Sequence, residues 1–293
     1  MKGLSEEIFN FLAESGYNLK CLTTGGIHNV LSVVMPDQKE RWIIPLSISA
    51  TDHRQALKAV EEAVSSIDRI TAKTGCRPLL IIQDRWNSQK AMTRSRLLSH
   101  LEQFTQIYAR NCEIRKIDKD TAAEFLKHNH SYGDAACRYR YGLYLKRHTG
   151  HNTALTTIVP GTLVAVATFS NARKWIKGDK VVRSYEWTRY ASLPQVRLSG
   201  GMGKMLQAFI DDVKPDDIMT YADLEWSEGK VYEALGFTLE GHKAPVTFAI
   251  DTSDWSRTAL RMNENETAPL QDSIRYYVNF GSNKYRLKLT DYH

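Results

Sequence analysis

The chain has 293 residues, of which 42% are hydrophobic and 25% charged, and its formal net charge is +6. This composition excludes a disordered or fibrous protein, and the length suits two domains with separate cores. No apolar run approaches the roughly 20 residues of a membrane span, and the acidic amphipathic start lacks the apolar core of a signal peptide. We therefore expect a cytoplasmic protein without a membrane partner.

The cysteines are few and widely spaced. Cys21, Cys76, Cys112 and Cys137 form no C-x-x-C pair, which argues against a zinc knuckle or a disulfide scaffold and fits a reducing compartment. No metal site is predicted. The positive net charge permits nucleic-acid binding without requiring it.

Residues 1–110 alternate between helical and extended patterns. The predicted elements are a helix at Glu6–Ser15, strands at Leu19–Thr23, Val30–Met35 and Arg41–Ile48, a helix from His53, a strand at Pro78–Gln83 and a basic helix at Gln89–Gln103. Asp52 is placed to cap the helix that begins at His53, and Gly75 is placed to end it.

This order resembles PD-(D/E)xK nucleases of the very-short-patch-repair type, with the tightest match at Ile82-Gln83-Asp84-Arg85-Trp86. Such a nuclease needs carboxylates on its central strands to hold a divalent cation. Neither predicted central strand contains one, and Asp84 stands alone. We interpret residues 1–110 as a degenerate nuclease-like α/β domain. An unrelated small α/β domain and a live nuclease with relocated acids are the alternatives.

Residues 111–293 are expected to form the second domain, after a bridge at Ile107–Asp118. Its predicted helices are Thr121–His130, Lys204–Val213 and Ser227–Leu235; its predicted strands are Tyr141–Lys146, Leu163–Phe169, Arg183–Tyr190, Ile218–Ala222, Thr247–Ile250, Tyr276–Phe280 and Lys284–Leu289. The polar stretch Asn263–Pro269 is predicted to be a surface loop.

A glycine-rich turn separates an aromatic strand from an amphipathic helix in this second domain. It reads Ser199-Gly200-Gly201-Met202-Gly203-Lys204. Backbone N–H groups can converge where a Cβ would intrude, and the helix adds its positive dipole end, which favours a phosphate or pyrophosphate. The spacing excludes a Walker A loop, because Met205 follows Lys204, and it excludes the G-x-G-x-x-G dinucleotide fingerprint. A strand-helix corner packed for its own sake is the alternative.

Together with Val231-Tyr232-Glu233-Ala234-Leu235-Gly236-Phe237, this turn resembles the GNAT acyltransferase superfamily over residues 112–250. The resemblance implies an α/β (α+β) fold with a mixed sheet flanked by helices. It also implies acetyl-CoA, or another acyl-CoA, held at Ser199–Lys204, with Tyr232 as the general acid that protonates the thiolate. The chain departs from the superfamily in having Leu198 at the first loop position and Glu225 where an Asn is common.

Three further residues are candidates for the acceptor side. His130 lies in the turn Asn129-His130-Ser131-Tyr132-Gly133, and Asp223 ends a predicted parallel strand, where open sheets bind ligands. Either could accept the amine proton, although Asp223 could instead cap a helix and His130 could be solvated. Glu186 and Arg189 have odd separation on one strand, so only one is expected in the cleft, and Arg189 is favoured.

The basic and aromatic residues of Arg138-Tyr139-Arg140-Tyr141 suit a nucleic-acid surface, but a strand with buried tyrosines and exposed arginines is the preferred interpretation. Within the superfamily, the nearest resemblance is to Mom-like DNA-modification proteins and to matching domains of phage nuclease fusions. This implies acyl transfer to a nucleobase or a nucleic-acid-associated amine. The alternative is a non-catalytic DNA-binding accessory of a mobile element or defence system.

Overall fold

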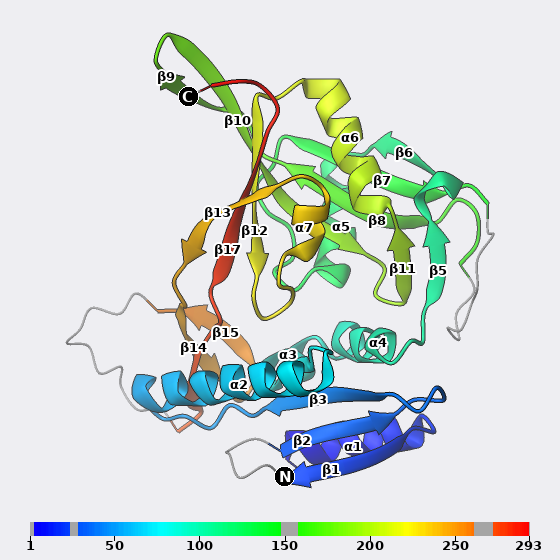
Figure 1. Ribbon diagram of the computed structural model, residues 1–293, viewed down its shortest axis with the longest axis vertical. Coiled ribbons are helices and arrows are strands. Elements are labelled where there is room, and N and C mark those ends of the chain that lie inside the picture. Colours follow the sequence, from blue (N-terminus) through cyan, green and yellow to red (C-terminus); the bar gives the residue numbers. More distant parts are fainter. Residues whose placement is uncertain (1–2, 24–28, 148–157, 261–271, 293) are drawn as a thin grey trace. The chain divides into compact units, whose positions relative to one another are not determined.

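The computed structural model describes residues 3–23, 29–147, 158–260 and 272–292. The chain divides into two compact units, shown in Figure 1: unit 1 is Met1–Leu101 with Ala244–Gly281, and unit 2 is Glu102–Lys243 with Ser282–His293. The loop predicted at Asn263–Pro269 lies outside the described residues.

Unit 1 is built on the predicted order of a helix, three strands, a helix and a strand. The four-stranded sheet has the order β1 (Asn18–Thr23), β2 (Asn29–Val34), β3 (Glu40–Leu46) and β4 (Leu79–Ile82), antiparallel except for the parallel β3–β4 pair. Its helices are α1 (Leu4–Glu14), α2 (His53–Thr74), α3 (Gln83–Ser88) and α4 (Lys90–His100). The Asp52 carboxylate accepts the Gln55 N–H at 2.8 Å, and Gly75 ends α2 in the left-handed conformation, as predicted. The basic helix predicted at Gln89–Gln103 is α4, which ends at His100, and the short helix α3 before it was not predicted.

A three-stranded antiparallel sheet from the C-terminal part of the chain completes unit 1. Its order is β15 (Ser256–Ala259), β14 (Thr247–Asp251) and β16 (Ile274–Val278). Ile250, Tyr277 and Val278 are buried in one cluster with the apolar face of α2. The predicted boundary at residue 110 therefore differs from the structure, because α2 exposes an apolar stripe that these distant strands cover.

Unit 2 contains the mixed sheet that the sequence predicted, with helices on both faces. The strand order is β13 (Thr238–Lys243), β17 (Ser282–Lys288), β12 (Asp217–Asp223), β10 (Lys180–Ser192), β8 (Leu163–Phe169), β7 (Tyr139–Leu145) and β6 (Cys112–Lys116), and β9 (Arg173–Lys177) pairs with one end of β10. Of the pairs described in this sheet, only β10–β12 is parallel. A separate parallel pair joins β5 (Thr105–Tyr108) to β11 (Val196–Ser199), which places residues 102–110 in unit 2.

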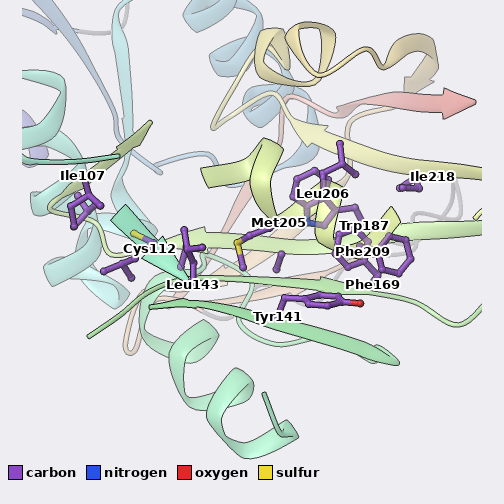
Figure 2. Close-up of a cluster of buried hydrophobic side chains, with 14 of the residues drawn as sticks. Ile107, Cys112, Tyr141, Leu143, Phe169, Trp187, Met205, Leu206, Phe209 and Ile218 are labelled. Atoms are coloured by element: carbon purple, nitrogen blue, oxygen red, sulfur yellow. The ribbon is translucent and has the colours of Figure 1, made fainter. Parts of the chain in front are cut away.

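The core of unit 2 lies mainly under α6 (Gly201–Val213). Phe209 of this helix stacks on Phe169 with ring centroids 3.9 Å apart, and Trp187 and Met205 pack in the same cluster, as Figure 2 shows. The opposite face is covered by α5 (Lys119–Asn129), whose Leu126 is buried with Val166. Apolar residues on both faces of β8 explain its nearly continuous burial. The two helices thereby fix the sheet from both sides.

Candidate functional site

β10 and β12 separate in the middle of the unit 2 sheet. Their parallel register covers only three pairs, of which Glu186 with Met219 is the last. Beyond this point β10 continues against β8, with a shift in register between Trp187 and Arg189 that marks a β-bulge. The side of β10 that faces β12 therefore presents backbone groups without a strand partner. Such a divergence of parallel strands is where open sheets bind ligands.

The bulge overturns the prediction that Glu186 and Arg189 face opposite sides of the sheet. Trp187 is opposite Phe169, but Arg189 is opposite Thr168, so the extra residue Thr188 reverses the alternation. Arg189 donates from Nε to the carbonyl of Gly133 at 3.1 Å. Burial lowers the pKa of Arg189, and the Glu186 carboxylate is the first of the nearby charges that oppose this. Both side chains therefore lie on the same side of β10.

The fold brings Arg189 next to the turn that contains His130. The two are far apart in the sequence, so this contact could not be predicted from it. His130 ends α5, and its Nδ1 accepts the N–H of Tyr132 at 3.1 Å, while Gly133 N–H donates to the His130 carbonyl. Because Nδ1 is an acceptor, the neutral imidazole carries its proton on Nε2. In this arrangement His130 presents a donor rather than a base.

The glycine turn leads directly into α6. Gly200 has φ 76° and precedes the helix, and the first helical hydrogen bond runs from the Lys204 N–H to the Gly200 carbonyl at 3.0 Å. The N–H groups of Gly201, Met202 and Gly203 thus lie in the first turn, where a helix offers them no acceptor. A Cβ on Gly201 would lie 2.4 Å from Leu198 Cδ2 and 3.1 Å from the Tyr190 hydroxyl, so a larger residue here would force these side chains to shift. The turn has the backbone geometry expected of an anion site.

The side chains at the two ends of this turn are already engaged. Lys204 Nζ donates to the carbonyls of Ala109 at 3.0 Å and Cys112 at 2.6 Å. Ser199 Oγ accepts from Gln106 Nε2 at 2.8 Å. Both contacts join the turn to the segment just before β6. Lys204 therefore fixes the turn rather than extending a free ammonium group from it.

Tyr232 lies in α7 (Lys230–Ala234) and is partly buried against the core. Its ring is 6.0 Å from that of Trp187 and 5.7 Å from that of Phe237. Burial raises the pKa of the Tyr232 phenol, and a hydrogen bond with Thr220 opposes the rise. Thr220 of β12 donates to the Trp187 carbonyl of β10 at 3.1 Å, which links the two strands close to the point where they separate.

Tyr190 is a residue that the sequence analysis did not single out. Its hydroxyl lies 3.1 Å from the position of a Cβ on Gly201, and its ring is 6.0 Å from that of Trp187. Burial raises the pKa of Tyr190, with a smaller contribution from Tyr232. The aromatic pattern of β10 indicates only a core strand. The Tyr190 hydroxyl lies beside the glycine turn because of the tertiary structure, and no local sequence pattern indicates this position.

Asp223 ends β12 and organises the turn that follows it. Its carboxylate accepts the N–H of Glu225 at 3.0 Å, and its carbonyl accepts those of Trp226 and Ser227. These bonds hold residues 224–229 out of the helix, which explains why α7 begins at Lys230 instead of the predicted Ser227. The helix cap of α7 is Gly229, so Asp223 caps a turn and not a helix.

Two other sequence features have structural roles. Tyr141 is buried and its hydroxyl donates to Asp212 at 2.7 Å, while Tyr139 packs on Phe209, as the preferred interpretation of that strand predicted for the tyrosines. Arg140, expected to be exposed, is instead half-buried and donates to the Cys137 carbonyl at 3.0 Å. Asp84 is buried and forms a two-point ion pair with Arg257 at 2.7 and 3.0 Å. Over the described ranges, no cluster of three His, Cys, Asp or Glu side chains could hold a metal ion. None of the helices described there is long and apolar enough to span a membrane.

Comparison with known proteins gave matches only among solved structures. No protein-family model and no curated protein sequence matches the chain. A structure of the NatC complex bound to Gag peptide and CoA aligns with a TM-score of 0.36 and 12% identity, over 61% of this chain and 99% of that one. An acetyltransferase from Bacillus subtilis in complex with CoA gives 0.33 and 12%, over 61% and 99%. The ribosomal-protein-S18-alanine N-acetyltransferase from Escherichia coli gives 0.33 and 13%, over 62% and 96%.

Proposed function

We propose that unit 2 is an acyl-CoA-dependent N-acyltransferase whose site lies where β10 and β12 separate. The observation that carries this proposal is the meeting of three features at one place. These are the N–H groups of the glycine turn, the unpaired edge of β10, and the phenol of Tyr232 packed against Trp187. Each offers a hydrogen-bond donor, as expected for a site that binds a pyrophosphate and a thioester.

The glycine turn fits the pyrophosphate of an acyl-CoA. Gly200 bends the chain, and the first-turn N–H groups of Gly201, Met202 and Gly203 supply donors for an anion. Ser199 is at the entrance to this turn. We assign Lys204 the role of holding the turn in place, because its ammonium group is bonded to two backbone carbonyls.

An acyl-CoA would supply a carbonyl activated by a thioester. Backbone N–H groups of β10 beyond the bulge would bind the carbonyl oxygen and stabilise its developing negative charge. The acceptor amine nitrogen attacks the carbonyl carbon, an N–C bond forms and the C–S bond breaks. Tyr232 then donates its phenolic proton to the departing thiolate.

Glu186 is the group we propose to take the proton from the amine. It is at the last paired position before β10 and β12 separate, and its carboxylate has no hydrogen-bond partner among the described residues. Asp223 is the second candidate for this role, at the end of β12, while the N–H of His130 Nε2 suits a donor contact to the acceptor.

The acceptor class that we propose is an amine of a nucleobase, or an amine associated with nucleic acid. The positive net charge of the chain supports this choice, because a polyanion carrying the amine would be attracted to it. A degenerate nuclease-like unit 1 agrees with the same class of substrate, and its candidate metal ligand Asp84 is neutralised by Arg257.

A second candidate function is a non-catalytic DNA-binding accessory. The formal net charge of +6 favours it, because a basic chain can bind a polyanion without any acyl-CoA. Release of free CoA thiol from acetyl-CoA, followed with DNA and with nucleosides as acceptors, separates the two. Acceptor-dependent release that is reduced in Glu186→Gln supports the enzyme. Acetyl-CoA that is neither bound nor consumed supports the accessory.

A further inference from the structure

β9 and the first residues of β10 form a two-stranded arm that extends beyond the unit 2 sheet, as Figure 1 shows. β9 pairs with Lys180–Ser184, whereas the ladders to β12 and β8 begin only at Ser184 and Trp187. The turn of the arm is Gly178-Asp179, with Gly178 at φ 56°. Residues 173–183, called the arm below, therefore pair as strands only with each other and with Ser184 in the part of the chain that the structure describes, although the backbone of Arg183 also bonds to Asp216.

The arm exposes apolar side chains on both of its faces. Ile176 is 82% exposed and is paired with Val181, which is 60% exposed. Trp175 is 50% exposed and, as the next residue in β9, points to the opposite face. If the arm exposed only lysines, they would be explained as charges that keep an edge strand from pairing with a strand of another chain. An exposed Trp, Ile and Val are not explained in that way and indicate a binding surface.

Basic residues surround these apolar side chains. The arm contains five, Arg173, Lys174, Lys177, Lys180 and Arg183, against the single acid Asp179. Arg183 lies 3.5 Å from Asp216, and Lys180 donates to the Asp291 carbonyl at 2.9 Å. Arg173 and Lys174 are exposed, and their side chains have no partner among the residues that the structure describes. Two available cations thus stand next to Trp175 and Ile176.

We propose that the arm is a nucleic-acid-binding element. Arg173 and Lys174 would contact phosphates, and Trp175 offers a planar ring on which a base can stack. A two-stranded ribbon is of the size that the major groove admits. Apolar groups on both faces suit insertion between the two walls of a groove, whereas a membrane surface would be met by one face. This inference goes beyond acyl transfer and does not depend on it.

The test is the fluorescence anisotropy of a labelled duplex of about 20 base pairs, and of its single strand, titrated with the full chain between about 50 and 200 mM salt. Arg173→Ser/Lys174→Ser should weaken binding at least tenfold at low salt and reduce the salt slope by about 1.8, because two phosphate contacts are lost. Trp175→Ala/Ile176→Ser should weaken binding about tenfold with little change in slope. The matched control Lys119→Ser/Lys127→Ser removes two exposed charges from α5 and should change affinity less than threefold.

All of the altered arm side chains are exposed, so the variants should unfold at the wild-type temperature. The inference is overturned if the arm variants bind nucleic acid as the wild type does, or if the wild type binds neither probe at low salt. It is also overturned if only anionic phosphatidylserine vesicles, or a second copy of the chain, engage the arm. Equal stabilisation of wild type and arm variants by acetyl-CoA keeps this outcome separate from that of the proposed transferase function.

Discussion

Tyr232 is the residue whose role in the proposed chemistry is most specific. A general acid must be protonated to act. Because the pKa of the Tyr232 phenol is raised above the ordinary tyrosine pKa of about 10, this group stays protonated at every pH below that ordinary value. Turnover should therefore show no loss from Tyr232 ionisation below that pH. Tyr232→Phe should lower kcat by about 100-fold or more and leave acetyl-CoA affinity within about twofold, because only the hydroxyl is removed. Stopped-flow release of CoA thiol measures this, and unchanged turnover would remove Tyr232 from the mechanism.

Some of the candidate site residues could be predicted from the sequence, and others could not. The glycine turn was recognisable because Gly200, in the left-handed conformation, satisfies a local backbone requirement, and local requirements are visible in sequence. The orientation of Glu186 was not, because the bulge at Thr188 arises from the pairing of β10 with β8, far along the chain. Tyr190 was missed for a related reason: its hydroxyl is placed by the packing of β10 against α6.

Among the elements, α3 and β15 are joined by the buried Asp84–Arg257 pair. Arg257 also lies over the rings of Phe248 and Tyr277, at 5.1 and 4.7 Å from their centroids. Arg257→Met should destabilise unit 1 by about 3–5 kcal/mol, because it leaves the Asp84 charge buried without a partner. Asp84→Leu/Arg257→Met should cost less than the single variant. Urea unfolding measures both, and a double variant as unstable as Arg257→Met would argue against this account.

Element order was largely predictable, and element boundaries and short strands were less so. Long periodic segments such as α2 and α6 were found because their apolar stripes are local signals. β5, β6, β9, β11, β13 and β15 were missed, and the predicted bridge at Ile107–Asp118 is instead the end of β5 followed by β6. β13, for example, is largely exposed and has no alternating apolar pattern. These strands form because a neighbouring strand pairs with them, and that neighbour is known only once the tertiary structure is known.

At the scale of the whole molecule, the two units are interleaved in sequence, since 244–281 belongs to unit 1. Lys243 and Ser282 are partners in the β13–β17 ladder, so the two ends that flank this insertion lie side by side. A chain of residues 102–243 joined to 282–293 by a short turn should fold and bind acetyl-CoA. Residues 1–110 alone should not fold, because Ile250, Tyr277 and Arg257 are missing from their core. Circular dichroism and thermal unfolding decide both, and a folded 1–110 fragment would contradict the discontinuous unit.

The most direct test of the central claim is the thermal unfolding of the full chain with and without acetyl-CoA. A ligand that binds only the folded protein, at 100 times its dissociation constant, adds about 2.7 kcal/mol to the free energy of unfolding. We expect a clear stabilisation in the wild type and in the control Gly241→Ala, where a Cβ would meet nothing within 4 Å. Gly201→Ala should reduce it, because the new Cβ would lie 2.4 Å from Leu198 Cδ2 and 3.1 Å from the Tyr190 hydroxyl and would force both side chains to shift beside the turn. Stabilisation of the wild type would show that this protein binds acyl-CoA. If acetyl-CoA, CoA and longer acyl-CoAs all fail to stabilise it, the claim that the glycine turn is a cofactor site is contradicted.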